Sequence, residues 1–242
     1  MQRGGDEASA GVELASEGLR GERFAGDDGT ADPRAAAALA AFAAGEGSEL
    51  DALTALAAGR LLVPVVARLG ENPPGAGEKA SVMALPTLVG ADGRAAIPAF
   101  TCVAALARWR QDARPLPTEA TLVWRAAMQD ACAVVIDVAG PVPLAVEGAR
   151  LAALAAGERP PPLHEDAEVR DAVAAIVAAA TSGAGGFRLA SPAQDADLLI
   201  ELRLPGGPGQ QGGDAVAAMI GQAVIQQLGG RLRRGIELAV TG

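Results

Sequence analysis

The sequence is poor in the residue types on which most binding and catalytic sites depend. Aromatic residues make up 2% of the 242 residues and tyrosine is absent, so binding by stacking on aromatic rings has little support. His164 is the single histidine, so a catalytic triad or a multi-histidine metal site would have to include it. The two cysteines, Cys102 and Cys132, form no C-x-x-C pair, which excludes a zinc knuckle and a disulfide scaffold. We therefore expect no metal and no cofactor.

Positive charge and long apolar runs are also scarce. The formal net charge is -9, which argues against general affinity for nucleic acid or anionic membranes, because both are bound through basic side chains. There is no run of about 18 uncharged apolar residues of the kind that spans a membrane. The polar residues 1–7 are not followed by the apolar segment of a secretory signal. These features predict a cytoplasmic protein.

Changes in composition divide the chain into three parts. The first 33 residues hold eight acidic residues and three arginines with little periodicity, so they cannot bury enough apolar surface to offset their ordering entropy. The proline-rich run GERPPP at 157–162 is typical of a stiff connector. The sequence therefore predicts a disordered acidic tail, an α+β domain and a smaller C-terminal domain, at residues 1–33, 34–157 and 158–242.

The stretch 84–110 gives the clearest structural pattern. We expect a β-hairpin with strands at 82–89 and 95–100, because the Asp-Gly pair in its turn at 91–93 supplies the positive φ angles of a tight turn. Thr101 is placed to cap the following helix, which has Trp109 on its apolar face.

Several other elements are predicted around this hairpin. Two short capped helices precede it, and the strand at 61–67 contains Pro64, which lacks an N–H and favours an edge or a bulge. After 157–162 the pattern is helix, strand, strand, helix, strand. The expected fold class is α+β, with a mixed, largely antiparallel sheet and flanking helices, followed by a smaller α-β-β-α-β unit.

Several segments resemble the SseB family in its actinobacterial form. They are LLVPVV at 61–66, LPTLVGADGRAAIPAFT at 85–101 with the helix that ends in Trp109, GPVP at 140–143 and GIELAV at 235–240. Cys102 stands where the family pattern leads us to expect serine. The resemblance implies an SseB N-terminal domain followed by an SseB C-terminal-like domain. It also implies an α+β body of unassigned biochemical role, and it supplies no catalytic set.

Few residues are candidates for chemistry. Cys102 opens a helix, where the dipole could favour the thiolate, although a buried structural cysteine is the commoner case. His164 precedes a helix start and is expected to face solvent. The glycine-rich loop 206–213 lies between a strand and a helix, but it lacks the lysine of a phosphate-binding loop, and Asp214 would occupy the N-cap. Among the carboxylates near apolar segments, which are Asp92, Asp137, Glu147 and Glu165, no spacing requires a catalytic pair.

Three arginines, Arg231, Arg233 and Arg234, cluster between the last predicted helix and strand. They could hold a carboxylate or phosphate, or only interact with the helix dipole. We take seven residues as candidates for a ligand or partner surface: Thr101, Cys102, Trp109, Asp137, Arg231, Arg233 and Arg234.

Two hypotheses for function follow from the sequence. The first is a non-enzymatic protein-interaction or regulatory module, with a protein partner or self-association through the strand edge at 61–67 or the hairpin and helix. The alternative is a small-molecule (amino acid or nucleotide) binding protein or enzyme. Its pocket would lie between the two halves of the chain, with Thr101, Asp137 and the arginines as its polar groups. Nucleic acid, membrane and metal are not expected partners.

Overall fold

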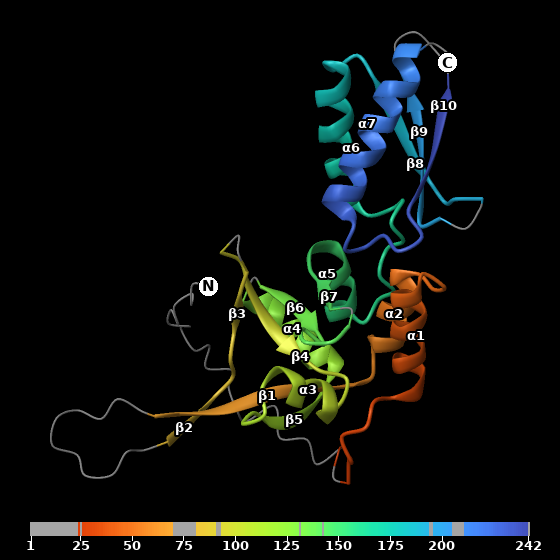
Figure 1. Ribbon diagram of the computed structural model, residues 1–242. Helices are drawn as coiled ribbons and strands as arrows, with labels where there is room; N and C mark the ends of the chain where they lie inside the picture. Colours follow the sequence, from red (N-terminus) through yellow and green to blue (C-terminus); the bar gives the residue numbers. More distant parts are fainter. Residues whose placement is uncertain are drawn as a thin grey trace, which may run out of the picture. The chain divides into compact units, whose positions relative to one another are not determined.

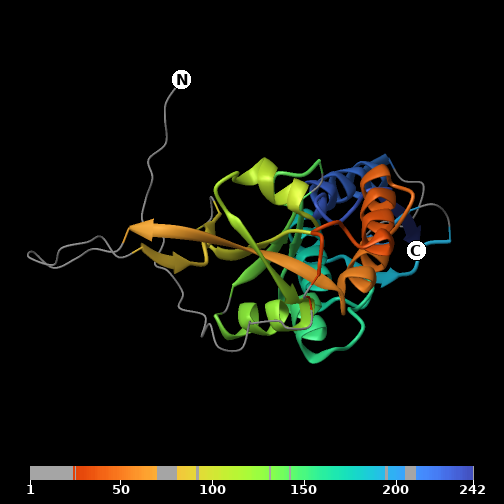
Figure 2. The same cartoon turned by 90° about the horizontal axis from the view of Figure 1, so that it is seen from below.

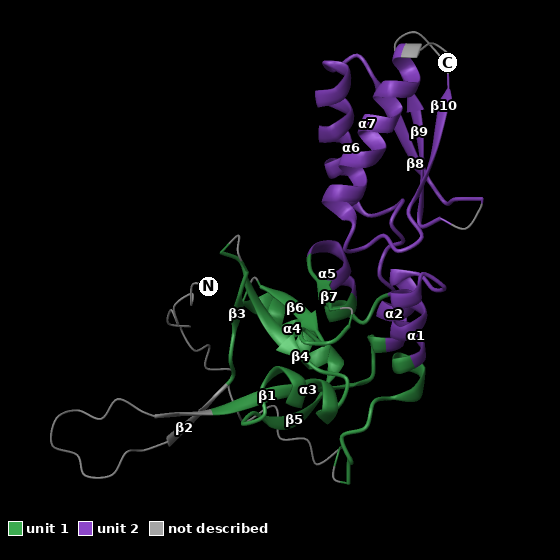
Figure 3. Ribbon diagram, in the orientation of Figure 1, with its two compact units in different colours: residues 1–36, 56–147, 154–158 green, residues 37–55, 148–153, 159–242 purple. Residues whose placement is uncertain are grey.

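A computed structural model describes Phe24 and residues 26–69, 81–90, 93–130, 132–141, 143–193, 196–204 and 211–241. The chain forms two units, shown in Figure 3. Unit 1 comprises residues 1–36, 56–147 and 154–158, and unit 2 comprises 37–55, 148–153 and 159–242. Most of the tail expected to be disordered lies outside the described residues, as do Asp92 and positions 206–210 of the glycine-rich loop. The predicted domain bounds stay a prediction.

Figure 1 labels the helices and strands. The helices are α1 (Pro33–Ala44), α2 (Glu49–Leu56), α3 (Val103–Trp109), α4 (Ala120–Gln129), α5 (Gly148–Ala156), α6 (Ala167–Thr181) and α7 (Gln211–Leu228). The strands are β1 (Arg60–Leu69), β2 (Ser81–Ala84), β3 (Leu88–Val89), β4 (Ala95–Ala99), β5 (Arg114–Glu119), β6 (Ala133–Ile136), β7 (Leu144–Val146), β8 (Gly186–Ala190), β9 (Leu198–Arg203) and β10 (Ile236–Thr241). None of the helices in the described part of the chain is long and apolar enough to cross a membrane.

The strands of unit 1 form two small sheets, which together with the helices confirm the predicted α+β class. One has the order β2-β1-β5 and is antiparallel throughout. The other has the order β3-β4-β6-β7, with a parallel β4–β6 pair between antiparallel pairs. Helices α3 and α4 both contact β1, and Figure 2 shows β1 running between them. The core includes the fully buried Trp124, whose Nε1–H donates to the Ala57 carbonyl at 3.2 Å.

The expected sheet edge at 61–67 is wrong, because β1 is the central strand of its sheet. Pro64 lies opposite Pro115 of β5, and Leu62 lies opposite Pro117. The N–H and C=O of Leu62 point away from β5 and bond to Phe100, at 2.8 and 2.9 Å. In an antiparallel pair every second residue has the same orientation, so the nitrogens of Pro64, Pro115 and Pro117 point away from the β1–β5 ladder. β2 pairs with β1 only at residues 66–69, so the side that the Pro64 nitrogen faces belongs to no strand ladder at that position, and the missing N–H is tolerated.

The predicted hairpin is only partly correct. Residues 82–89 do not form one strand, because β2 pairs with β1 and only the two residues of β3 pair with β4. Pro86 lies between β2 and β3. Because proline has no N–H, it cannot donate a ladder hydrogen bond at this position, and the predicted strand is interrupted there. Helix α3 is capped by Cys102 rather than Thr101, since the Cys102 Sγ accepts a hydrogen bond from Ala105 N at 3.4 Å.

The C-terminal part of unit 2 confirms the predicted α-β-β-α-β order, as α6, β8, β9, α7 and β10. The sheet order is β10-β9-β8, with β10 parallel and β8 antiparallel to β9. In β9, Leu198, Ile200 and Leu202 alternate into the core formed with α6 and α7. Both helices cover the same face of the sheet (Figure 1). The opposite face we call the open face.

Candidate functional site

The three candidate arginines, Arg231, Arg233 and Arg234, lie in unit 2, on the segment between α7 and β10. Arg231 donates from Nε to Glu49 Oε2 at 3.0 Å and from Nη2 to Asp166 Oδ2 at 2.7 Å. Arg150, from α5, donates from Nη1 to the other oxygen of Glu49 at 2.5 Å. Two carboxylates and two guanidinium groups thus form what we call the buried ion-pair network.

Helix ends hold the carboxylates of the buried ion-pair network in place. Glu49 is the first residue of α2, and Asp166 is the N-cap of α6, where its Oδ1 accepts from Glu168 N at 2.9 Å. A negative charge at either position interacts favourably with the helix dipole. Glu49 and Arg150 are 4% and 3% exposed, and Asp166 is 0% exposed. The four charges cancel, which is the condition under which buried charges are tolerated.

Electrostatics fix the protonation state of Arg231. Burial of the guanidinium opposes its charge, but the charges and hydrogen bonds of Glu49 and Asp166 outweigh this, so the pKa of Arg231 is raised above its ordinary value. Such a group donates hydrogen bonds but does not exchange protons near neutral pH. Arg231 therefore acts in the network as a permanent donor that holds segments of unit 2 together.

The other two arginines are bound to Asp197, which precedes β9. Its Oδ2 accepts from the backbone N–H groups of Arg233 and Arg234, both at 2.7 Å, and its Oδ1 accepts from Arg234 Nε at 3.1 Å. The Arg233 guanidinium lies over the Phe42 ring, 5.0 Å from its centroid, which is cation–π geometry. Both arginines thus have partners within unit 2.

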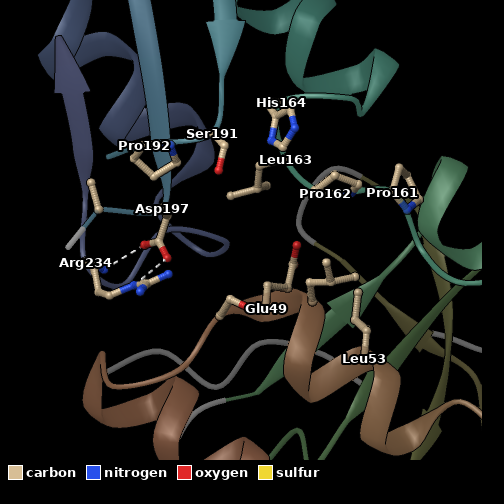
Figure 4. A pocket seen from close by; sticks show the side chains of 13 residues that line it. Glu49, Leu53, Pro161, Pro162, Leu163, His164, Ser191, Pro192, Asp197 and Arg234 are labelled. Carbon is tan, nitrogen blue, oxygen red and sulfur yellow. Dashed lines mark hydrogen bonds and ion pairs between the residues drawn. The ribbon is translucent and has the colours of Figure 1, made fainter. Parts of the chain in front are cut away.

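A pocket of about 270 Å³ adjoins these groups in unit 2 (Figure 4). Its wall combines apolar side chains of α2 and the proline-rich segment with polar groups. The lining residues are Ser48, Glu49, Leu50, Leu53, Pro161, Pro162, Leu163, His164, Ser191, Pro192, Ala196, Asp197 and Arg234. His164 has its Nε2 3.6 Å from Glu165 Oε1.

Three of the polar groups that line the pocket are engaged in ion pairs. Its two carboxylates, Glu49 and Asp197, are already held by arginines. No hydrogen bond joins Ser191 to His164 within the described part of the chain, so the two do not form the nucleophile and base pair of a hydrolase. The described residues also contain no cluster of three or more His, Cys, Asp or Glu that could hold a metal ion.

Sequence reasoning missed Glu49, Arg150 and Asp166. Asp166 carried a usable signal, since it follows the prolines and precedes an apolar helical pattern, as an N-cap does. Glu49 and Arg150 carried none, because they are separated by 101 positions and no local pattern pairs them.

A second polar cluster lies in unit 1, where Thr101 and Asp137 meet. Thr101 donates from its backbone N–H to Asp137 Oδ1 at 2.9 Å and from its hydroxyl to Oδ2 at 2.7 Å. The two residues follow β4 and β6, and the carboxyl ends of parallel strands lie at the same edge. Arg60 Nη1 donates to the Thr101 carbonyl at 2.8 Å, and Asp27 pairs with Arg60 Nε at 2.6 Å.

The remaining candidates of unit 1 have packing roles. Trp109 and Phe100 stack with ring centroids 5.5 Å apart, and Cys102 packs against the same cluster. Burial, reinforced by the charge of Asp130, raises the pKa of the Cys132 thiol, which disfavours the reactive thiolate. The structure therefore brings Thr101 and Asp137 together, and it places the candidate arginines in the other unit.

These observations define a two-unit α+β protein with a parallel strand pair in unit 1 and a helix-covered mixed sheet in unit 2. Residues 36–153 match the family model described as the SseB protein N-terminal domain. No curated protein and no solved structure matches the chain. Glu49 and Arg150 lie inside the matched region, whereas Asp166 and Arg231 follow it.

Proposed function

We propose that the protein is a non-enzymatic protein-interaction or regulatory module of the cytoplasm. We further propose that the whole chain is of the SseB family in its actinobacterial form, with residues 158–242 as the SseB C-terminal-like domain. The segment at 235–240 supports this extension, because it continues the family pattern beyond the matched region.

The edge of β10 is the observation that carries the interaction function. Within the described residues, β10 pairs only with β9, so one side of its backbone has hydrogen-bonding groups without a strand partner. Its sequence, IELAVT, has no proline and one charged residue, Glu237. An unprotected edge of this kind is a template for pairing with another strand.

Other sheet edges in the described residues are protected or short. β5 contains Pro115 and Pro117, whose nitrogens have no proton to offer, and β8 carries the exposed Arg188 and begins with Gly186. β3 and β7 have two and three residues, and β2 has four. Among the edge strands of the described residues, β10 is the longest that contains no proline.

Affinity capture with matched variants tests this function. The full chain, Ala239→Lys on β10 and Ala190→Lys on β8 would each be used as bait. Both alanines lie on the open face of the same sheet, at its two edges. We expect specific partners to be lost with Ala239→Lys and kept with Ala190→Lys. Equal recovery by all three baits would exclude the β10 edge as the binding surface.

Small-molecule binding is the second candidate function, and the pocket of unit 2 favours it. Its volume of about 270 Å³ is closer to an amino acid than to a nucleotide, since drug-sized ligands occupy pockets of about 300–1,000 Å³. Thermal-shift screening against amino acids and nucleotides tests this function. We expect a stabilising ligand to lose its effect with Ser191→Ala and to keep it with Gln222→Ala on α7. No stabilisation across the panel would count against this candidate.

A further inference from the structure

We propose that two copies of the chain associate through their β10 strands, paired antiparallel about a two-fold axis. This inference rests on the proposed interaction function and names its partner as a second copy of the chain. The two sheets of unit 2 would then form one continuous sheet, with the helices of both copies on the same side. An isologous contact of this kind closes on itself and does not propagate into a fibre.

A buried oxygen in β10 has no partner within the described chain. Glu237 Oε2 is shielded from solvent and makes no hydrogen bond to any described residue. Its neighbours Ile236 and Leu238 pack against the helix-covered core, so Glu237 is on the open face. A buried acceptor without a donor is costly, and on an edge strand a donor can come from an adjacent strand.

The alternation of side chains restricts the register of this pairing. Residues opposite each other in an antiparallel pair share a face, so Leu238 must lie opposite a core-facing residue of the second copy. One permitted register has Ala239 opposite its own counterpart. It then puts Leu238 opposite Val240, and Glu237 opposite Thr241. Small residues meet at the axis, and the two Glu237 carboxylates stay apart.

Thr241 supplies the donor that Glu237 lacks in this register. The Thr241 residue is exposed, and its hydroxyl makes one long hydrogen bond, at 3.3 Å, to the Leu202 carbonyl. A hydroxyl can rotate about its C–O bond to suit a new acceptor. Once the Glu237 carboxylate turns outward toward the strand edge, Thr241 of each copy can donate to Glu237 of the other, and a two-fold axis gives this contact twice.

Helix α7 adds apolar surface beside the same edge. Gly221 faces β10 closely, because a Cβ built on it would lie 2.8 Å from Leu238 Cδ1. Ile225 is one turn further along the same side of the helix and is 49% exposed. A second copy paired at β10 would cover this side chain. Five paired residues and two flanking helices make a small interface, so we expect reversible association with a micromolar or weaker Kd.

Sedimentation velocity on the full chain across micromolar to near-millimolar concentrations tests the proposal. We expect a concentration-dependent change from monomer to dimer. Ala239→Lys should weaken association at least about 10-fold, because two lysines would face each other at the axis, whereas Ala190→Lys should leave it unchanged. Thr241→Val should weaken association about 3- to 10-fold by removing the donor to Glu237. Circular dichroism establishes that each variant is folded.

The outcomes separate this inference from the broader proposed function. A monomer at every concentration, or equal effects of the two lysine substitutions, overturns self-association through β10. Capture of a different protein through the same edge would still support an interaction function. If Ala239→Lys does not fold, Thr241→Val provides the test, because it changes an exposed residue and should leave the fold intact. A dimer of unaltered affinity in Thr241→Val would overturn the assigned register.

Discussion

Loss of the Glu49 charge should destabilise unit 2 strongly. Glu49→Gln keeps the shape of the side chain but removes the charge that pairs with both Arg150 and Arg231, which leaves two guanidinium groups and the one carboxylate of Asp166, bound to Arg231, in the network. Removing one partner of a buried ion pair costs about 3–5 kcal/mol, because the remaining charge is buried without compensation. With a urea m-value of about 2 kcal/mol/M, the transition midpoint should fall by about 1.5–2.5 M.

Two optical probes can locate this effect. Both tryptophans, Trp109 and Trp124, belong to unit 1, so tryptophan fluorescence reports on that unit. Far-UV circular dichroism also detects α6 and α7 of unit 2. For Glu49→Gln we expect the dichroism transition to move to lower urea, with a smaller change in fluorescence if the units unfold separately.

A neighbouring residue supplies the control for this experiment. Glu46 lies three positions before Glu49 and is exposed, so Glu46→Gln should change stability by less than about 0.5 kcal/mol. Equal dichroism midpoints for Glu46→Gln and Glu49→Gln would refute the reasoning. Such a result would mean that burial of the network contributes nothing to the free energy of unfolding.

Two further predictions concern hydrogen-bonded carboxylates. The Ser48 hydroxyl holds the pKa of Asp51 below its ordinary value of 3.8, so Asp51 stabilises the fold above about pH 4 and loses this effect as the pH falls through its lowered pKa. Asp51→Asn should therefore cost about 0.5–1 kcal/mol at pH 7 and less at acid pH, in urea titrations followed by dichroism. Asp137→Ala should cost about 2–4 kcal/mol by tryptophan fluorescence, because it removes both bonds to Thr101 at a residue with φ of +48°. Asp137→Asn should cost less, since asparagine tolerates that φ and keeps one acceptor. Equal costs for the two variants would show that neither the backbone conformation nor the remaining acceptor contributes to stability.

Most of the helices and strands could be predicted because their signals are local in the sequence. The errors concern which strands pair, which local signals do not specify. The α-β-β-α-β order of unit 2 was predictable because caps, apolar periodicity and glycine-rich breaks are local. Pro64 misled the prediction, since a proline is tolerated in a central strand where its nitrogen faces a side that has no ladder at that position. Similarly, the strand at 82–89 was predicted as one element, although its first half pairs with β1 and not with β4.

The sequence by itself determined the fold class, the resemblance to the SseB family and the scarcity of groups suited to catalysis, because these depend on composition and on short-range patterns. Tertiary structure alone decided which charges meet. Glu49, Arg150, Asp166 and Arg231 come from four separate segments, and only folding places them within hydrogen-bond distance. The tertiary structure also decided which strand edge has no partner. Edge exposure depends on the neighbours that a strand acquires, and a strand's own residues do not specify them.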